Sequence, residues 1–245
     1  MGVRRLLAAL GVAVLVAVFI GLGFWQLDRL DEKRAFNRTL LARGARPVES
    51  VQQVALEPDA AYRRVWAGGT YDTAHEFVVG PRSHRGLSGY HVVTPFRLDD
   101  GRAVVVDRGW VPLQLRDPPI REAAPPSGSV RVEGVLVPSE TRKRFGPQEE
   151  EGPHQSLFRV DIPRLQDQLT YEVLPLYLLL EREAPAQPGQ LPSQVDLAPL
   201  DEGPHLAYAI QWFLFAAGAV VAAVVVAKRK GRSRPAASVV DPPRS

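Results

Sequence analysis

The sequence contains no cysteine, and Met1 is its only methionine. A chain without thiols forms no disulfides, thiolate zinc sites, iron–sulfur clusters or covalent c-type haem links. It also offers no internal sulfur ligand for copper(I), which prefers cysteine and methionine. The lack of cysteine does not assign a compartment, because it shows only that nothing in the chain depends on an oxidising one.

Motifs typical of enzymes are also missing. The sequence has no HExxH helix, no P-loop and no Rossmann glycine pattern. Residues 86–90 resemble the G-x-S-x-G nucleophile elbow, but Tyr90 stands where its last glycine is required. A hydrolase would need Ser88 within hydrogen-bonding reach of His84 or His91. We therefore predict that the chain is not an enzyme, and a membrane-anchored hydrolase remains an alternative.

The excess of positive charge is small and lies at the two ends of the chain. The 30 basic and 27 acidic residues give a formal net charge of +3. Arg4 and Arg5 precede the first long apolar run, and Asp241 is the only acidic residue after the second. The basic residues after the second run are Lys228, Arg229, Lys230, Arg232, Arg234 and Arg244. Without these nine residues, the chain holds 22 basic and 26 acidic residues, so we predict no nucleic-acid partner.

Two long uncharged runs, residues 6–24 and 206–227, predict transmembrane helices. Nineteen helical residues span about 28 Å, close to the roughly 30 Å hydrocarbon core of a bilayer. The first run could instead be a signal peptide. However, its apolar core is longer than usual, and Trp25 and Gln26 follow where small cleavage-site residues are expected. We therefore predict that the first run is an uncleaved anchor.

The flanking charges predict how the chain crosses the bilayer. Basic residues lie on the terminal side of each run, so the positive-inside rule places both termini in the cytoplasm. Residues 1–5 then form a cytoplasmic N-terminus, residues 25–205 an extracytoplasmic domain and residues 228–245 a basic, disordered cytoplasmic tail. Arginine outnumbers lysine and no transit segment precedes the first run, so we predict a multi-pass protein of the bacterial plasma membrane.

The intervening domain is predicted to be mainly antiparallel β, of the α+β class, flanked by the two transmembrane helices. Residues 25–41 should extend the first helix as far as Gly44 and Pro47. A hairpin is expected at residues 99–101, and a short helix at residues 161–169 after an Asp161 N-cap. The predicted strands are residues 64–71, 76–79, 91–98, 103–111, 130–137 and 176–181.

The start of the second apolar run holds the strongest candidate binding residues. His205, Tyr208 and Trp212 share one helix face, with the imidazole at the membrane border and the aromatic rings below it. Imidazole is a common ligand of haem iron, and a flat macrocycle would suit such a face. The alternative is an ordinary interfacial aromatic belt with one histidine.

A basic stripe lies where the first run ends. Trp25, Arg29 and Lys33 recur every four residues and therefore share a helix face. These cations could pair with haem propionates or with acidic groups of a partner, or they could reach lipid headgroups. In the domain, we interpret Gly80-Pro81-Arg82 as a strand end and Arg108 as part of a packed sheet corner. Both arginines could pair with acids such as Asp107.

Taken in order, these segments resemble the Surfeit-locus-one family, called Shy-type in yeast, of cytochrome c oxidase assembly factors. No single segment is specific, but the ordered set is, and it runs from the first apolar run to the second. The matching segments are residues 23–26 with Arg29 and Lys33, 80–82, 89–96, 106–112, 140–142 with Phe145, and 205–208 with Trp212.

The resemblance implies a non-enzymatic membrane protein that assists maturation of the haem-copper oxidase, around insertion of haem a into its catalytic subunit. Its implied partners are that subunit, the haem a synthesis machinery and the lipid bilayer. His205 matches the histidine regarded as the haem-iron ligand in bacterial relatives, whereas Arg29, Arg82 and Arg108 match positions without a defined role. Because the chain lacks sulfur ligands for copper, the remaining choices are a haem chaperone or a scaffold that recruits another envelope protein without binding haem.

Overall fold

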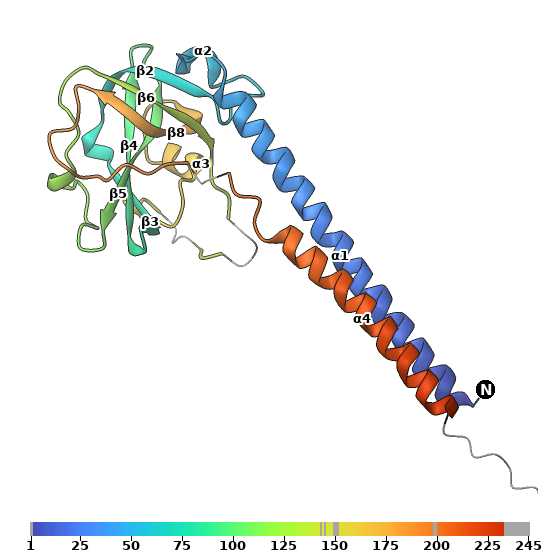
Figure 1. The fold of residues 1–245 in the computed structure, drawn as a ribbon. Helices are drawn as coiled ribbons and strands as arrows, with labels where there is room; N and C mark the ends of the chain where they lie inside the picture. The colour runs from blue at the N-terminus through green and yellow to red at the C-terminus, as the bar shows by residue number, and fades with distance from the viewer. Residues whose placement is uncertain (1, 143, 145, 149–151, 198–199, 233–245) are drawn as a thin grey trace, which may run out of the picture. The chain divides into compact units, whose positions relative to one another are not determined.

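The computed structural model describes residues 2–142, 144, 146–148, 152–197 and 200–232. The chain forms two compact units (Figure 1). One is the helical unit, made of the terminal segments Met1–Asn37 and Leu200–Ser245, and the other is the sheet domain, Arg38–Pro199.

Two long helices dominate the terminal segments: α1 (Val3–Gly44) and α4 (His205–Arg232). Both are long and apolar enough to cross a membrane, and only 6% and 11% of their most apolar stretches are buried within the protein. The predicted extension of the first helix to Gly44 is confirmed. Helix α4 continues five residues past the predicted end of the second run, so residues 228–232 are helical. The rest of the predicted tail, residues 233–245, lies outside the described residues.

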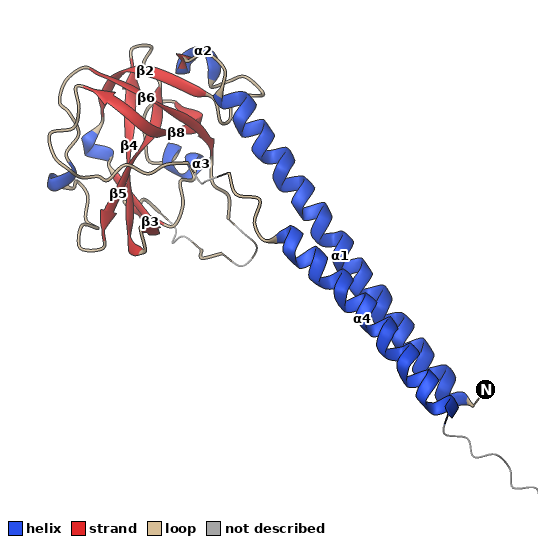
Figure 2. Cartoon of the chain, in the orientation of Figure 1, coloured by secondary structure: helices blue, strands red, loops and turns tan. Residues whose placement is uncertain are grey.

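The described residues of the sheet domain form eight strands in one mixed sheet, shown in red in Figure 2. Five of its eight strand pairings are antiparallel, as predicted, but β1–β2, β3–β7 and β5–β8 are parallel. The strands are β1 (Glu49–Ser50), β2 (Arg64–Tyr71), β3 (Phe77–His84), β4 (Leu87–Leu98), β5 (Ala103–Pro112), β6 (Val130–Pro138), β7 (Ser156–Leu157) and β8 (Val173–Ala184). The short helices are α2 (Val51–Val54), α3 (Ile162–Gln166) and the 3-10 turns η1 (Thr73–His75) and η2 (Arg121–Ala123).

Five of these strands close into a ring. The strand order is β1-β2-β6-β8-β5-β4-β3-β7, and β2 also pairs with β4 through residues 69–71 and 96–98. Strands β2, β6, β8, β5 and β4 therefore form a small barrel, from which the sheet continues through β3, paired with β4, to β7, paired with β3. Side chains fill its interior, as expected for a barrel of this size; the largest include Phe96, Leu136, Leu174 and Leu178.

Strand β5 is buried on both faces. Val104 and Val106 point into the barrel, while Val105 packs in a second core with Leu165 of α3 and Tyr177 of β8. This double burial explains why residues 103–106 read as a continuous apolar run rather than an alternating one. The Asp161 N-cap of α3 is also confirmed, because its carboxylate accepts from the Arg164 N–H at 3.4 Å.

A β-bulge in β5 lies beside two neighbouring charged residues that contact different parts of the protein. Val92 pairs with Gly109 and Val93 with Asp107, so Arg108 is the additional residue. Asp107 and Arg108 are 3% and 2% exposed, yet Asp107 contacts His91 whereas Arg108 contacts Glu76. Both an acid and a base therefore lie inside the domain, next to the bulge.

The interpretation of Gly80-Pro81-Arg82 as a strand end is wrong. Strand β3 continues to His84, and its register with β4 shifts between Val79 and Arg82. A proline can lie in a strand at such an irregularity, because the regular ladder of hydrogen bonds is interrupted there and does not need the N–H that proline lacks.

Candidate functional site

Helices α1 and α4 of the helical unit pack through aromatic rings and one glycine. The Phe19 ring lies 5.7 Å from Trp212 and 5.8 Å from Phe215, measured between centroids. A Cβ atom on Gly23 would lie 2.5 Å from the Phe213 ring, so only glycine allows this approach. The aromatic residues of α4 are therefore partly used to join the two helices.

His205 is the first residue of α4, and its imidazole reaches across to α1. Its Nδ1 lies 2.8 Å from Oε1 of Gln26. When Nδ1 carries the proton and donates it to this oxygen, Nε2 keeps its lone pair and can bind a metal. A hydrogen bond of this kind is the usual second contact of a metal-binding histidine, because it fixes the tautomer and the ring orientation.

The residues just before His205 are also fixed to α1. Arg34 donates from Nε and Nη2 to the two oxygens of Glu202, at 3.0 Å each. This hydrogen bond lowers the pKa of the Glu202 carboxyl and raises the pKa of Arg34. Between Glu202 and His205, Gly203 has φ +69°, and a Cβ there would lie 3.5 Å from Nε2 of His205. The glycine therefore leaves the space beside Nε2 open.

The other predicted site residues lie on the same two helices, and in the described part of the chain none of them hydrogen-bonds to His205. Tyr208 is 47% exposed and Trp25 is 54% exposed, whereas Trp212 stacks on Phe19. Arg29 forms an ion pair with Glu32, and its side chain is half exposed. Around the axis of α1, with about 100° between successive residues, Trp25 and Arg29 lie about 100° and 60° from Gln26, both in the same direction of rotation. Their role in binding stays a prediction.

Gln26 is the site residue that sequence reasoning missed, because an amide side chain carries no metal-binding signal. Its position does follow a helical spacing. Phe19, Gly23, Gln26, Leu30 and Arg34 recur every three or four residues, and the first three and Arg34 contact α4 or the segment before it. Leu30 is 3% exposed. This spacing marks the α1 face that packs against the C-terminal segment.

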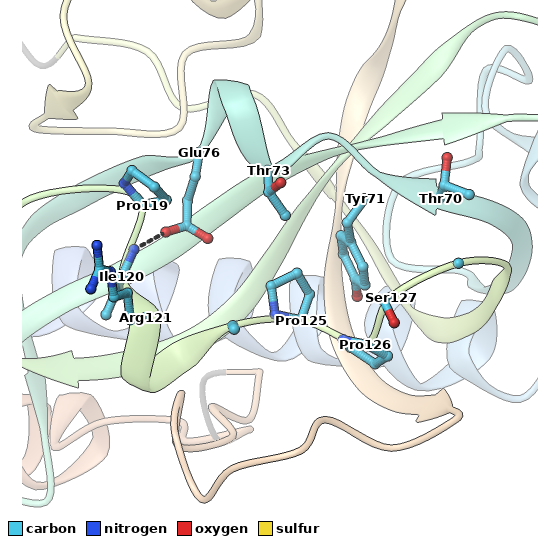
Figure 3. Close-up of a pocket in the computed structure, with 12 residues that line it drawn as sticks. Thr70, Tyr71, Thr73, Glu76, Pro119, Ile120, Arg121, Pro125, Pro126 and Ser127 are labelled. Atoms are coloured by element: carbon cyan, nitrogen blue, oxygen red, sulfur yellow. Dashed lines mark hydrogen bonds between the residues drawn. The ribbon is translucent and has the colours of Figure 1, made fainter.

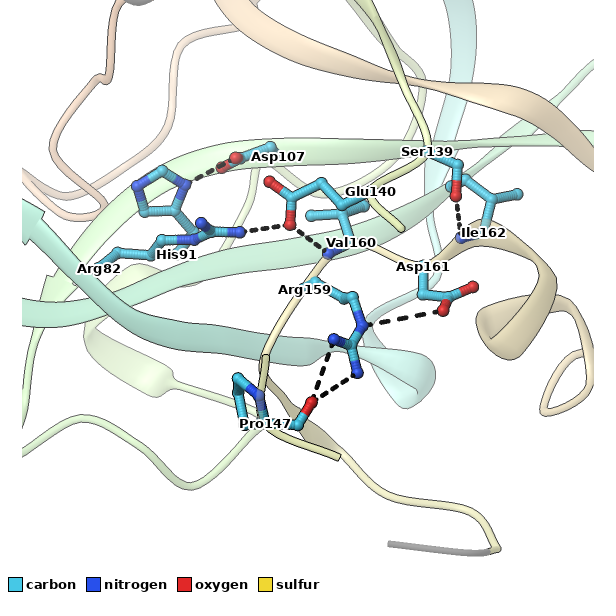
Figure 4. A network of polar contacts seen from close by, with 10 residues as sticks. All are labelled: Arg82, His91, Asp107, Ser139, Glu140, Pro147, Arg159, Val160, Asp161 and Ile162. Carbon is cyan, nitrogen blue, oxygen red and sulfur yellow. Dashed lines mark hydrogen bonds and ion pairs between the residues drawn. The ribbon is translucent and has the colours of Figure 1, made fainter. Parts of the chain in front are cut away.

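Arg82 and Arg108 of the sheet domain pair with acids other than Asp107, the acid that the sequence suggested. Arg108 Nη1 lies 3.4 Å from Oε2 of Glu76, and both side chains are buried. Arg82 Nη2 lies 2.5 Å from Oε2 of Glu140, which also accepts from the Val160 N–H (Figure 4). The predicted pairing with acids is correct, but both partners are glutamates far along the chain.

Asp107 is bound to a histidine instead. His91 Nδ1 lies 2.7 Å from Oδ2 of Asp107 (Figure 4). His84 stacks on Trp110, with 5.4 Å between the ring centroids. Among the described residues, Ser88 hydrogen-bonds to neither histidine, so the arrangement that a hydrolase would need is not formed there. Nor does that part of the chain hold a group of three or more His, Asp or Glu side chains placed for a metal ion.

Comparisons with known proteins agree with the predicted resemblance. The SURF1 family model matches residues 13–217. A SURF1-like protein of Monosiga brevicollis is 31% identical over 236 residues, covering 89% of this chain and 86% of that protein. A SURF1-like protein of Rickettsia felis is 26% identical over 217 residues, covering 87% and 94%. Surfeit locus protein 1 of Takifugu rubripes is 32% identical over 153 residues, covering 54% and 62%. With the family model matching from one terminal helix to the other, the chain belongs to the SURF1 family.

Proposed function

We propose that this protein is a membrane-anchored assembly factor for haem-copper cytochrome c oxidase, which assists insertion of haem a into the catalytic subunit or stabilises that subunit. Membership of the SURF1 family supports the oxidase role. The contact between His205 Nδ1 and Gln26 Oε1 supports haem handling, because it leaves Nε2 available as an iron ligand.

The apolar surfaces of α1 and α4 support membrane anchoring. Their most apolar stretches are almost unburied within the protein, and exposed apolar area of that extent needs lipid or a partner. Basic residues lie on the chain-terminal side of each stretch, which favours cytoplasmic termini and an extracytoplasmic sheet domain. A bacterial plasma membrane is the compartment that we propose.

In this proposal haem a is cargo that is passed on to the catalytic subunit of the oxidase. His205 would hold the iron through Nε2, while Gln26 fixes the imidazole and Gly203 keeps the space beside it open. The exposed rings of Trp25 and Tyr208 offer apolar surface beside the histidine. Trp212 would contribute the edge of a ring whose face packs on Phe19, and Arg29 would pair with a propionate.

Absorption spectra of the protein purified from a host that makes haem a test this assignment. We expect wild type to carry haem a, His205→Ala to lose it, and Gln26→Leu to bind it about 10- to 100-fold more weakly. His75→Ala is the control, because this partly exposed imidazole lies in the sheet domain and contacts Asp72. Equal haem content in wild type and His205→Ala would remove His205 as the ligand.

Deletion of the gene tests the oxidase role independently of haem binding. We expect a lower content of assembled aa3-type oxidase with unchanged haem a synthesis, measured from spectra of isolated membranes. A deletion strain with a normal oxidase spectrum would contradict the proposal.

A scaffold that acts without haem is the second candidate, and the packing of Trp212 on Phe19 favours it, because that ring face joins the helices. The scaffold role predicts that His205→Ala restores the oxidase in the deletion strain as well as wild type does. The haem-handling role predicts that it does not.

A further inference from the structure

The sheet domain contains a cavity of about 390 Å³ that the proposed function does not use (Figure 3). It lies between the end of β2, the turn η1 and the loop that carries η2. The Tyr71 ring and the rings of Pro119, Pro125 and Pro126 form apolar walls, and Glu76 supplies a carboxylate. This volume falls in the range of roughly 300–1,000 Å³ that is usual for small-ligand sites.

The Glu76 carboxylate is buried but incompletely paired. The residue is 1% exposed, and Oε1 accepts one short hydrogen bond, from the Ile120 N–H at 2.7 Å. Oε2 has two contacts, Thr94 Oγ1 and Arg108 Nη1, both at 3.4 Å, the outer limit for a hydrogen bond. Burial raises the pKa of Glu76, and its contacts with Ile120, Arg108 and Thr94 offset only part of that effect. Oε2 therefore has capacity for a further donor.

Of the two charged residues that line the cavity, Glu76 is the buried one. Arg121 also lines the cavity but is exposed to solvent, which screens its charge. Arg108 is buried and is not part of the lining, although its guanidinium contacts Oε2 of Glu76; its guanidinium carbon lies 5.2 Å from the Tyr71 ring centroid. A Glu183 oxygen accepts from the Tyr71 hydroxyl at 2.8 Å and adds a second negative charge nearby.

We propose that this cavity binds a small organic cation: an amidinium or ammonium group on a short, flat apolar stem. The cation donates to Oε2 of Glu76, and a charge-assisted hydrogen bond of this kind is about twice as strong as a neutral one. The stem packs on the Tyr71 ring and the proline rings, where an aromatic face also attracts the positive charge. An anion of the same shape is rejected by the Glu76 carboxylate.

Three probes with the same phenyl ring test the proposal by calorimetry on the full-length protein in detergent: benzamidine, benzamide and benzoate. We expect saturable binding of benzamidine, about tenfold weaker binding of benzamide, and no binding of benzoate. Benzamidine that does not saturate, equal affinities for benzamidine and benzamide, or binding of benzoate would each overturn the proposal.

A matched pair of variants locates the binding. Ser127 and Ser129 are both exposed, but only Ser127 lines the cavity. We expect Ser127→Trp to abolish benzamidine binding and Ser129→Trp to leave it unchanged. Glu76→Gln should weaken benzamidine about tenfold while sparing benzamide. If Glu76→Gln does not fold, the serine pair decides, and unchanged binding to Ser127→Trp contradicts the proposal. Haem spectra of Ser127→Trp should match wild type, which separates this test from that of the proposed function.

Discussion

Replacing Glu76 with leucine is expected to lower the unfolding free energy of the sheet domain by about 3–5 kcal/mol. Arg108 is fully buried, and Glu76 is the carboxylate that contacts its guanidinium. Without that carboxylate, the buried positive charge keeps only the more distant carboxylate of Glu183 as compensation. Urea unfolding of the full-length protein in detergent, followed by tryptophan fluorescence, measures the change.

Two comparisons show whether the buried charge is the cause. Glu181→Leu removes the acid of the exposed Arg64–Glu181 pair and should cost less than about 1 kcal/mol. The double variant Glu76→Leu/Arg108→Met removes both buried charges and should recover most of the stability lost by Glu76→Leu. A double variant less stable than Glu76→Leu alone would show that packing, and not the unpaired charge, sets the cost.

Substitution of Gly109 by alanine is expected to destabilise the sheet domain by at least about 3 kcal/mol. Gly109 lies in the β5 bulge with φ +127°, a conformation that L-residues rarely adopt. Its Cβ would also lie 2.3 Å from the carbonyl oxygen of Ser193. The clash would separate Ser193 from Trp110, whose main-chain N–H and C=O both hydrogen-bond to Ser193 at 2.8 Å.

Gly101 provides the matched control for this substitution. It has φ +87° in the β4–β5 turn, and nothing lies within 4 Å of the position its Cβ would take. Gly101→Ala therefore carries the backbone strain without the clash, and should cost about 1 kcal/mol. Urea unfolding compares the two variants. Equal losses of stability would mean that contact with Ser193 is unimportant.

Local patterns predicted most of the elements of this fold. Residues 64–71 form β2 as predicted, because alternating buried side chains and flanking turns are a local signal. Asp161 caps α3 for an equally local reason. The two-residue strands β1 and β7 were not predicted, since two residues carry no periodicity. The parallel pairing of β5 with β8 depends on strand order, which no local pattern specifies.

In the candidate site, too, residue type and local position could be predicted from the sequence, whereas contacts between distant segments could not. The imidazole of His205 could be identified from residue type and its place at the end of an apolar run. Its partner Gln26 lies 179 residues away, and the contact depends on which faces of two helices meet. The partner of Arg108 was likewise hidden, because Glu76 lies 32 residues away and no local pattern specifies that the two side chains meet.

Closure of the barrel limits how another protein can recognise the sheet domain. In the strand pairings of the described residues, β1 and β7 end the order, and each has two residues. Beyond Val79, the outer edge of β3 carries Pro81, which has no N–H to donate. Strand addition, as in donor-strand complementation or domain swapping, therefore has almost no backbone on which to start. A client of this domain must be recognised through loops and side chains.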